Sequence, residues 1–143
     1  MKAIDPELLQ ERTRVLEYHL TRIKETLPAD PVAFTRGTDV ADVVSLHLLF
    51  GIQVVLDFSV FACIHFGLQA PASYDDAVAR LAHAGRISDS LADRLEKAAN
   101  FRDAFVHAFE LLDAPSIYRG ARVLPDDLRM FMADIAGHLG DRP

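Results

Sequence analysis

The feature that most constrains the fold of this chain is an apolar stretch over residues 43–70, in which Asp57 is the only formally charged residue. Such a stretch is long enough to cross a bilayer as one helix, so a membrane span is one interpretation. Asp57 lies near its middle, however, and Gln53, His47 and His65 add polar groups without a basic flank that would orient a span. The sequence therefore favours a helix buried in the core of a globular protein.

Capping signals predict helices before this stretch and through it. The sequence D-P-E at residues 5–7 supplies an N-cap, a first-turn proline and an acid that favours the helix dipole, and apolar spacing continues the helix to about residue 27. Prolines at 28 and 31 end it. The long apolar helix is predicted to begin near Asp39 and to close at Gly67 and Pro71.

Two further helices follow. The third is short and lies between Ser73, which is a capping residue, and Gly85, which supplies a left-handed stop. Ser88 caps the fourth, and its apolar residues recur at helical spacing as far as Leu112, so we expect it to end near Pro115.

The C-terminal part is predicted as a loop and a last helix. Residues 113–122, D-A-P-S-I-Y-R-G-A-R, are assigned to the loop, and P-D-D at residues 125–127 opens a final helix ended by Gly140. Five helices with mostly short connections predict an all-α, up-down helical bundle, formed by a single domain over residues 1–143.

Composition limits the class of function. The chain has 15 Lys and Arg against 21 Asp and Glu, a formal net charge of −6, which argues against binding nucleic acid through bulk attraction. The single cysteine, Cys63, lies in an apolar run and indicates a buried thiol and a reducing, cytoplasmic setting. The sequence has no Gly-rich phosphate loop, zinc motif or paired cysteines, so no metal or cofactor is predicted.

The segment over residues 100–109, N-F-R-D-A-F-V-H-A-F, places Arg102 and His107 among phenylalanines. Five helical residues turn by about 140° beyond one full turn, so the two side chains flank a face that a second copy of the helix could cover. An imidazole can move a proton to or from a ribose hydroxyl or leaving oxygen, and a guanidinium can stabilise a phosphorane. Composition alone favours rim residues of a helix over this catalytic interpretation.

The segment F-R-D-A-F-V-H-A-F resembles the F-R-N-x-x-V-H-x-Y signature of HepT-like proteins in the HEPN superfamily. The apolar helix with G-I-Q-V-V-L-D, the segment P-A-S-Y-D-D-A-V-A-R-L-A-H-A-G-R-I-S and the later L-L-D-A-P-S-I-Y-R follow the order of that family. The resemblance covers nearly all of the chain after residue 12.

The resemblance implies a homodimer that joins two Arg/His pairs in one cleft as a metal-independent endoribonuclease, commonly a toxin, with Arg102 and His107 as catalytic residues. It also implies a partner, a minimal nucleotidyltransferase antitoxin of the MntA type, which binds the toxin and adds AMP to the signature tyrosine. An RNA substrate follows from the same resemblance.

Two positions depart from the family pattern. The signature tyrosine is replaced by Phe109, which has no hydroxyl for AMP, so modification is expected to be absent or moved to another residue such as Tyr118. Asp103 stands where asparagine is usual, and a carboxylate there is expected to pair with Arg102 and repel phosphate.

Other polar residues are open to two interpretations. Asp57, taken as buried, either orients Arg102 or His107 or makes a structural hydrogen bond to a helix end or a tyrosine, and Gln53 is taken as structural. The arginines outside the signature either line an RNA cleft or are solvated; they are Arg36, Arg119 and Arg122.

Three functions are therefore compared. The first is a HepT-like ribonuclease toxin. The second is a binding subunit that docks a nucleotidyltransferase, in which Asp103 and Phe109 mark a weakened or inactive site. The third is a structural homodimer without a partner.

Overall fold

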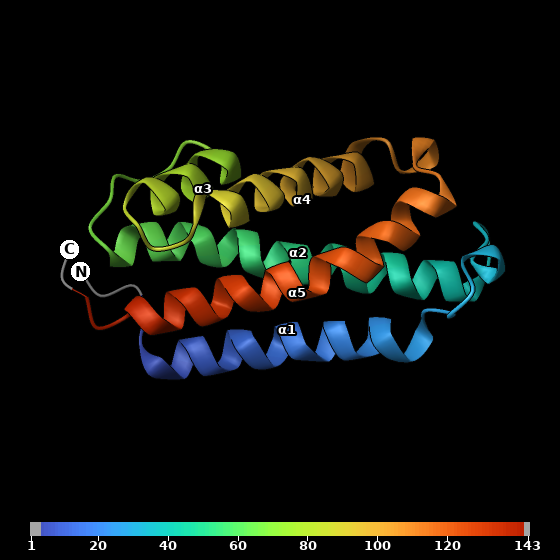
Figure 1. The fold of residues 1–143 in the computed structure, drawn as a ribbon, viewed down its shortest axis with the longest axis horizontal. Helices are drawn as coiled ribbons and strands as arrows, with labels where there is room; N and C mark the ends of the chain where they lie inside the picture. Colours follow the sequence, from blue (N-terminus) through green and yellow to red (C-terminus); the bar gives the residue numbers. More distant parts are fainter. Residues whose placement is uncertain (1–3, 142–143) are drawn as a thin grey trace.

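A computed structural model describes residues 4–141 of the chain, and within that range it contains helices and no strand. The prediction of an all-α bundle with five α-helices is confirmed (Figure 1). The elements are α1 (Pro6–Thr26), the 3-10 helix η1 (Pro31–Ala33), α2 (Asp39–His65), α3 (Tyr74–His83), α4 (Asp89–His107), the 3-10 helix η2 (Phe109–Leu111) and α5 (Ala114–His138).

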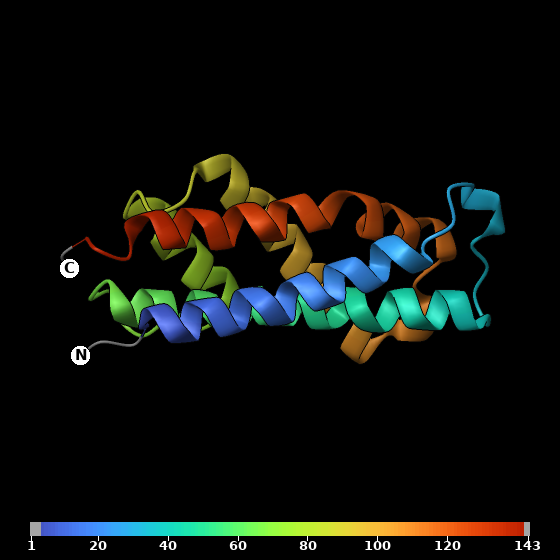
Figure 2. The ribbon, with the colours of Figure 1, turned by 90° about the horizontal axis from the view of Figure 1, so that it is seen from below.

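The long helices α1, α2 and α5 lie side by side along the bundle, as Figures 1 and 2 show from two directions. The shorter α3 and α4 cover another side of α2, so that α2 contacts all four other α-helices. α1 begins and α5 ends at the same end of the molecule (Figure 1). The apolar helix is therefore the centre around which the rest of the chain packs.

α2 owes its central place to its composition. Leu48, Ile52 and Phe58 are fully buried, because apolar side chains occupy nearly every side of this helix. α2 is long and apolar enough to cross a membrane by length and composition, yet 56% of its most apolar window is buried inside the bundle. The prediction of a core helix is confirmed.

The predicted helix starts are mostly confirmed because their signals are local. Asp5, Ser73 and Ser88 each accept a hydrogen bond from a backbone N–H of the first turn that follows them. Gly85 ends α3 with a φ of 75°, in the left-handed region where glycine is favoured.

Two predicted boundaries in the C-terminal part are wrong. α4 ends at His107 and not near Pro115, because Ala108 leaves helical geometry with φ −149° and ψ 42°. α5 begins at Ala114, so the segment predicted as a loop is helical. Asp113 caps this helix by accepting a hydrogen bond from the backbone N–H of Ser116 at 2.7 Å, and Pro115 occupies the first turn.

Pro125 lies inside α5 instead of opening a helix. A proline has no backbone N–H, so the carbonyl of Ala121 loses the partner that a helix normally provides four residues later. α5 changes direction part-way along its length in Figure 1, as expected for a helix with an internal proline.

α4 and α5 pack closely where Gly120 faces Phe101. A Cβ atom at Gly120 would lie 3.2 Å from Cε1 of Phe101, closer than side chains normally approach. Glycine at this position therefore lets α5 lie against the helix that carries Arg102 and His107.

Candidate functional site

The candidate site lies where α4 crosses α2, and four side chains from three helices form a connected network there. Arg102 of α4 donates from Nε to Oε1 of Gln53 on α2 at 2.9 Å. Gln53 in turn donates from Nε2 to Oδ1 of Asp57 at 2.8 Å, and Asp57 accepts a second hydrogen bond from the hydroxyl of Tyr74 at 2.6 Å. We call the contact line between α2 and α4, which carries this network, the α2–α4 seam.

The prediction that Asp57 is buried is wrong. Its side chain is exposed in the described chain, because it points outward from α2 beside the start of α3. Neither Arg102 nor His107 contacts it; its partners are Gln53 and Tyr74. Asp57 does accept a hydrogen bond from a tyrosine, as one interpretation expected, but Tyr74 is half-buried and not the buried tyrosine of that interpretation.

Sequence reasoning missed Tyr74. It took Gln53 as structural and did not predict its hydrogen bond to Arg102. Tyr74 is the first residue of α3, and its ring lies 5.7 Å from the guanidinium carbon of Arg102. The hydrogen bond to the Asp57 carboxylate raises the pKa of the Tyr74 phenol, so the hydroxyl stays protonated and donates. No spacing in the sequence links residues 57 and 74, since the contact depends on how α3 returns over α2.

Asp103 forms the ion pair with Arg102 that the sequence predicted. The distance from Nη1 of Arg102 to Oδ1 of Asp103 is 2.9 Å, and the Asp103 side chain is 58% exposed against 24% for Arg102. The guanidinium thus donates to two acceptors, the neutral amide oxygen of Gln53 and the anionic carboxylate of Asp103. The anionic partner is the more exposed member of the ion pair.

His107 is the last residue of α4 and is exposed. Its ring makes no hydrogen bond within residues 4–141, and the hydrogen bonds of Arg102 go to Gln53 and Asp103. The neighbouring Val106 is 51% exposed. A single copy of the chain therefore presents the two signature side chains on one helix without bringing them together.

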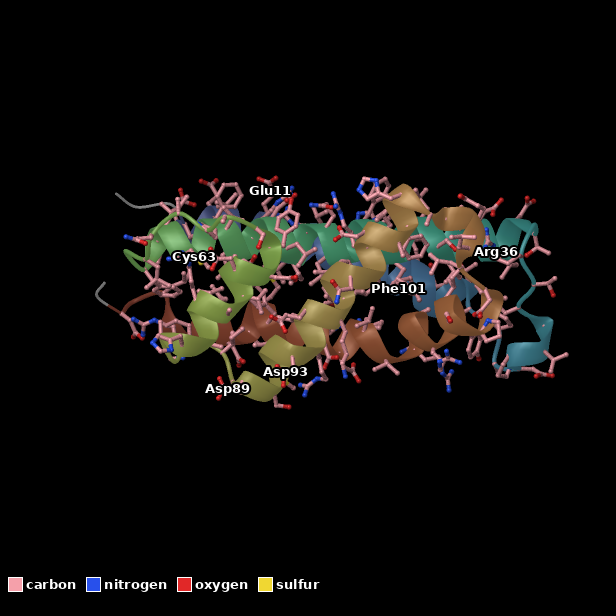
Figure 3. The ribbon with its side chains drawn as sticks, turned by 90° about the horizontal axis from the view of Figure 1, so that it is seen from above. Glu11, Arg36, Cys63, Asp89, Asp93 and Phe101 are labelled. Atoms are coloured by element: carbon pink, nitrogen blue, oxygen red, sulfur yellow. The ribbon has the colours of Figure 1, made fainter. Side chains whose placement is uncertain are left out.

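Phe109 lies in η2, just beyond the end of α4. Its ring stacks on Phe105 with centroids 5.6 Å apart, and the guanidinium of Arg36 lies 4.4 Å from its centre. Arg36 also donates to the carbonyl of Leu112, which fixes it at the end of the bundle opposite Cys63 (Figure 3). The guanidinium of Arg36 thus makes two contacts within its own chain, one with the Phe109 ring and one with the Leu112 carbonyl.

Arg119 and Arg122 lie on α5 and not in a loop. Arg122 is exposed and lines a groove of about 320 Å³ between α1 and α5, which is a different pair of helices from the one that holds Arg102. Arg119 is exposed and contacts Ser116 at 3.4 Å. Neither arginine has a contact with the signature residues, so their role in RNA binding stays a prediction.

Tyr118 is not available as a substitute for the signature tyrosine. It is only 7% exposed, and its hydroxyl lies 2.7 Å from the carbonyl oxygen of Pro28 and 3.0 Å from that of Ala29. A buried hydroxyl that donates to the connection after α1 cannot meet an incoming nucleotide without local unfolding. The suggestion that modification moves to Tyr118 is therefore wrong for the folded chain.

Cys63 is buried, and burial raises the pKa of its thiol to about 11. Its Sγ donates to the carbonyl of Ala77 at 3.4 Å. The prediction of a buried thiol is confirmed. Within the described part of the chain, no three His, Cys, Asp or Glu side chains gather in a way that could hold a metal ion.

Comparison with known proteins identifies the family of this chain. A family model described as "Ribonuclease HepT-like" matches residues 16–135, which is most of the chain. The chain therefore belongs to the HepT-like family, as its signature segment indicated. No curated protein matches the sequence significantly.

Solved structures with the same fold include members of toxin–antitoxin complexes. One, a toxin–antitoxin crystal structure with AMP-PNP, has a TM-score of 0.82 at 20% identity and covers 92% of this chain and 99% of its own. A tri-AMPylated HEPN toxin of Shewanella oneidensis in complex with its MNT antitoxin has a TM-score of 0.83 at 20% identity over 94% and 99%. YutE, a cytosolic protein of unknown function from Bacillus subtilis, has a TM-score of 0.81 at 20% identity over 97% and 93%.

Proposed function

We propose that this chain is the ribonuclease toxin of a toxin–antitoxin pair and that it cleaves RNA without a metal ion. The observation that carries the proposal is the placement of Arg102, which Gln53 holds at the α2–α4 seam on the same helix that exposes His107. Membership of the HepT-like family and the fold shared with toxins in complex with antitoxins support it.

The chemistry needs a base, an acid and a stabiliser of charge. A neutral imidazole of His107 takes the proton of a ribose 2′-hydroxyl, whose oxygen attacks the adjacent phosphorus. The guanidinium of Arg102 stabilises the charge that develops on the phosphorane oxygens. The bond from phosphorus to the 5′-oxygen breaks, that oxygen takes a proton from an imidazolium, and the products are a 2′,3′-cyclic phosphate and a 5′-hydroxyl.

We infer that the active form is a homodimer. Arg102 and His107 are separated by a turn of about 140° around α4, so one copy does not direct both at one phosphate. The outward side of α2 carries exposed Leu46, Phe50 and Phe61, which are 48%, 43% and 41% exposed. Exposed apolar side chains on this helix are suited to contact with a second copy, which would supply the missing half of each Arg/His pair.

We infer that the antitoxin is a minimal nucleotidyltransferase of the MntA type. Toxins of the same fold occur in complexes with antitoxins named MntA and MNT, and one of them is AMPylated. Phe109 has no hydroxyl to accept AMP, and Tyr118 is buried. Control of this chain would therefore act through binding and not through a modified signature residue.

A second candidate function is a binding subunit without ribonuclease activity. The ion pair between Arg102 and Asp103 favours it, because a carboxylate at 2.9 Å competes with a phosphate for the guanidinium. The pair is exposed on the Asp103 side, and exposed ion pairs contribute little free energy, about 0 to 1 kcal/mol, so an incoming phosphate can displace the carboxylate. We therefore place the ribonuclease first.

The test is cleavage of structured and single-stranded RNA by purified protein in EDTA, with the product ends mapped. His107→Ala and Arg102→Ala should both abolish cleavage, while His83→Ala should not. His83 is a matched control because it is the exposed last residue of α3, as His107 is of α4. Intact RNA with the folded wild-type dimer, or cleavage that survives His107→Ala, would contradict the proposal.

A further inference from the structure

His107 is held in place by its backbone, because its exposed ring makes no hydrogen bond within residues 4–141. The backbone at this point is the end of a helix, since Ala108 leaves helical geometry directly afterwards. The helix alone therefore fixes His107 from one side only. Its position also depends on what holds the segment that follows, which is η2.

Two phenylalanine rings bridge the end of α4 on its inner side. Phe105 and Phe109 lie two residues before and two residues after His107, and their rings stack with centroids 5.6 Å apart. Phe105 is only 7% exposed and packs edge-on against Phe101, at 4.8 Å between centroids. Because both bridging rings pack against the core, the backbone between them presents His107 to the outside.

Arg36 closes the outer end of this row of rings. It comes from the connection between η1 and α2, and its guanidinium carbon lies 4.4 Å from the centre of the Phe109 ring. The same guanidinium donates to the carbonyl of Leu112, so it contacts η2 at its first residue and at the residue that follows its end. In Figure 3, Arg36 lies farther along the bundle than Phe101. A side chain from before α2 thus fixes the segment after α4.

We propose that Arg36 is a positioning residue for His107 and acts by holding Phe109 and η2 in place; the proposal rests on the ribonuclease function proposed above. A planar guanidinium is suited to this role, because it can lie over a ring and donate from its edge at the same time. Both contacts lie within the chain, so Arg36 is assigned to the placement of the imidazole and not to contact with RNA. A displacement of about 1 Å can lower the rate of a reaction by about a hundredfold.

Kinetics separate this role from RNA binding. Arg36→Met should lower kcat for RNA cleavage by about tenfold and leave KM unchanged, because it displaces a group that acts in the transition state. Arg36→Lys should restore little of the rate, since an ammonium keeps the charge but cannot make both contacts. Arg14→Met is the matched control, because Arg14 is an exposed arginine on α1 and the substitution removes the same charge.

Salt dependence gives the opposite result for an RNA ligand. A lost phosphate contact would weaken binding of RNA to the His107→Ala protein and reduce the slope of log affinity against log salt by about one. Fluorescence anisotropy with a single-stranded RNA measures this slope. Arg36→Met should leave it unchanged.

Hydrogen exchange tests the position of His107 without any cleavage. The backbone N–H groups of Ala108, Leu111 and Leu112 each donate a hydrogen bond around η2, and Arg36→Met should accelerate their exchange by about tenfold while the core of α2 stays protected. Phe109→Leu removes the ring and keeps the guanidinium, and it should accelerate the same groups. In the Phe109→Leu background, Arg36→Met should have a smaller effect than in the wild type, because both residues act through one contact.

The two proposals fail in different ways. If Arg36→Met raises KM, lowers the salt slope and leaves kcat and hydrogen exchange unchanged, Arg36 is an RNA ligand and the positioning role is wrong. Faster exchange throughout the chain would also overturn that role, because it would indicate a general loss of stability. If the wild type cleaves no RNA and exchange is accelerated only around η2, the ribonuclease function is wrong and Arg36 still holds His107.

Discussion

Arg102 reaches Gln53 at 2.9 Å and does not contact Asp57, although Asp57 is the only formally charged residue in the apolar stretch of α2. The guanidinium is oriented by a neutral amide, and the carboxylate acts one step further away by orienting that amide. The anionic partner in direct contact with the guanidinium is Asp103, at 2.9 Å from Nη1.

This arrangement predicts that Gln53 and Tyr74 are positioning residues. Gln53→Ala should lower the rate of RNA cleavage by about tenfold, because it frees Arg102 to leave the productive geometry. Tyr74→Phe should have a smaller effect, since it removes the hydrogen bonds of the Tyr74 hydroxyl with Asp57 and Gln53 and keeps the direct bond from Arg102 to Gln53. Steady-state kinetics should show the loss mainly in kcat. A lower melting temperature, with a loss of rate no larger than the loss of folded protein, would instead indicate a purely structural role.

Asp103→Asn should raise cleavage by about two- to fivefold, because it removes the anionic competitor at 2.9 Å from the guanidinium. The measurement is the initial rate on the same RNA at low ionic strength, where exposed charges act most strongly. Asp93→Asn is the control, since Asp93 is an exposed acid on the same helix without an ion pair. Unchanged activity in Asp103→Asn would favour the binding-subunit function.

Tyr118→Phe should destabilise the fold by about 1 to 3 kcal/mol, because it leaves the carbonyls of Pro28 and Ala29, which follow α1, without this donor. Urea unfolding measures the effect. Tyr18→Phe is the comparison, since Tyr18 is 58% exposed and its hydroxyl makes no hydrogen bond within the described residues. Similar stability losses in both variants would contradict the assigned role of Tyr118.

Phe109→Tyr should restore a modification site. Incubation with an MntA-type nucleotidyltransferase and ATP should add AMP to this variant and leave wild-type Phe109 unmodified, as mass spectrometry can show. AMP found on Tyr118 of the folded wild-type chain would contradict the burial of that hydroxyl.

A pair of histidines between α1 and α2 predicts a loss of stability in acid. Nδ1 of His19 lies 2.9 Å from Nδ1 of His47, and burial lowers both pKa values, with His47 adding to the effect on His19 and Arg22 to that on His47. The unfolded state then binds more protons than the folded state below the ordinary pKa of 6.5, so stability falls as the pH drops through that value toward the lowered folded pKa values.

Melting temperatures measured at about pH 7.5 and about pH 5.5 should show this loss, and the double variant His19→Gln, His47→Gln should reduce it. His83→Gln is the control, because His83 is exposed at the end of α3. A pH dependence that the double variant leaves intact would assign the effect to other groups.

The sequence predicts those parts of the fold that depend on neighbouring residues. Ser73 and Ser88 cap helices by hydrogen bonds to backbone groups three residues away, so a local pattern is enough. The sequence also predicted the ion pair of Arg102 with its direct neighbour Asp103.

Proline signals were ambiguous in the C-terminal part. Pro115 and Pro125 are both preceded by residues that permit a helix start, and only the capping hydrogen bond of Asp113 selects the first. A proline in the first turn and one inside a helix look alike in sequence, since what distinguishes them is whether the preceding turn is already formed.

The geometry of the site could not be predicted, because it depends on contacts between distant parts of the chain. Spacing within one sequence does not indicate such contacts. Asp57 was expected to be buried because the surrounding residues are apolar, but the side of α2 that stays open depends on where α1, α3 and α4 lie. The hydrogen bond from Tyr74 joins residues seventeen positions apart, and it exists because α3 turns back over α2.

Phenylalanine at position 109, held between Phe105 and Arg36, has a consequence for timing. Under the proposed function, a covalent AMP group would outlast the dissociation of an antitoxin, whereas this chain would regain activity as soon as the complex dissociates. The chain would stay inactive only while the concentration of free antitoxin exceeds the dissociation constant of the complex. Degradation of the antitoxin would then restore activity without an enzyme that removes AMP.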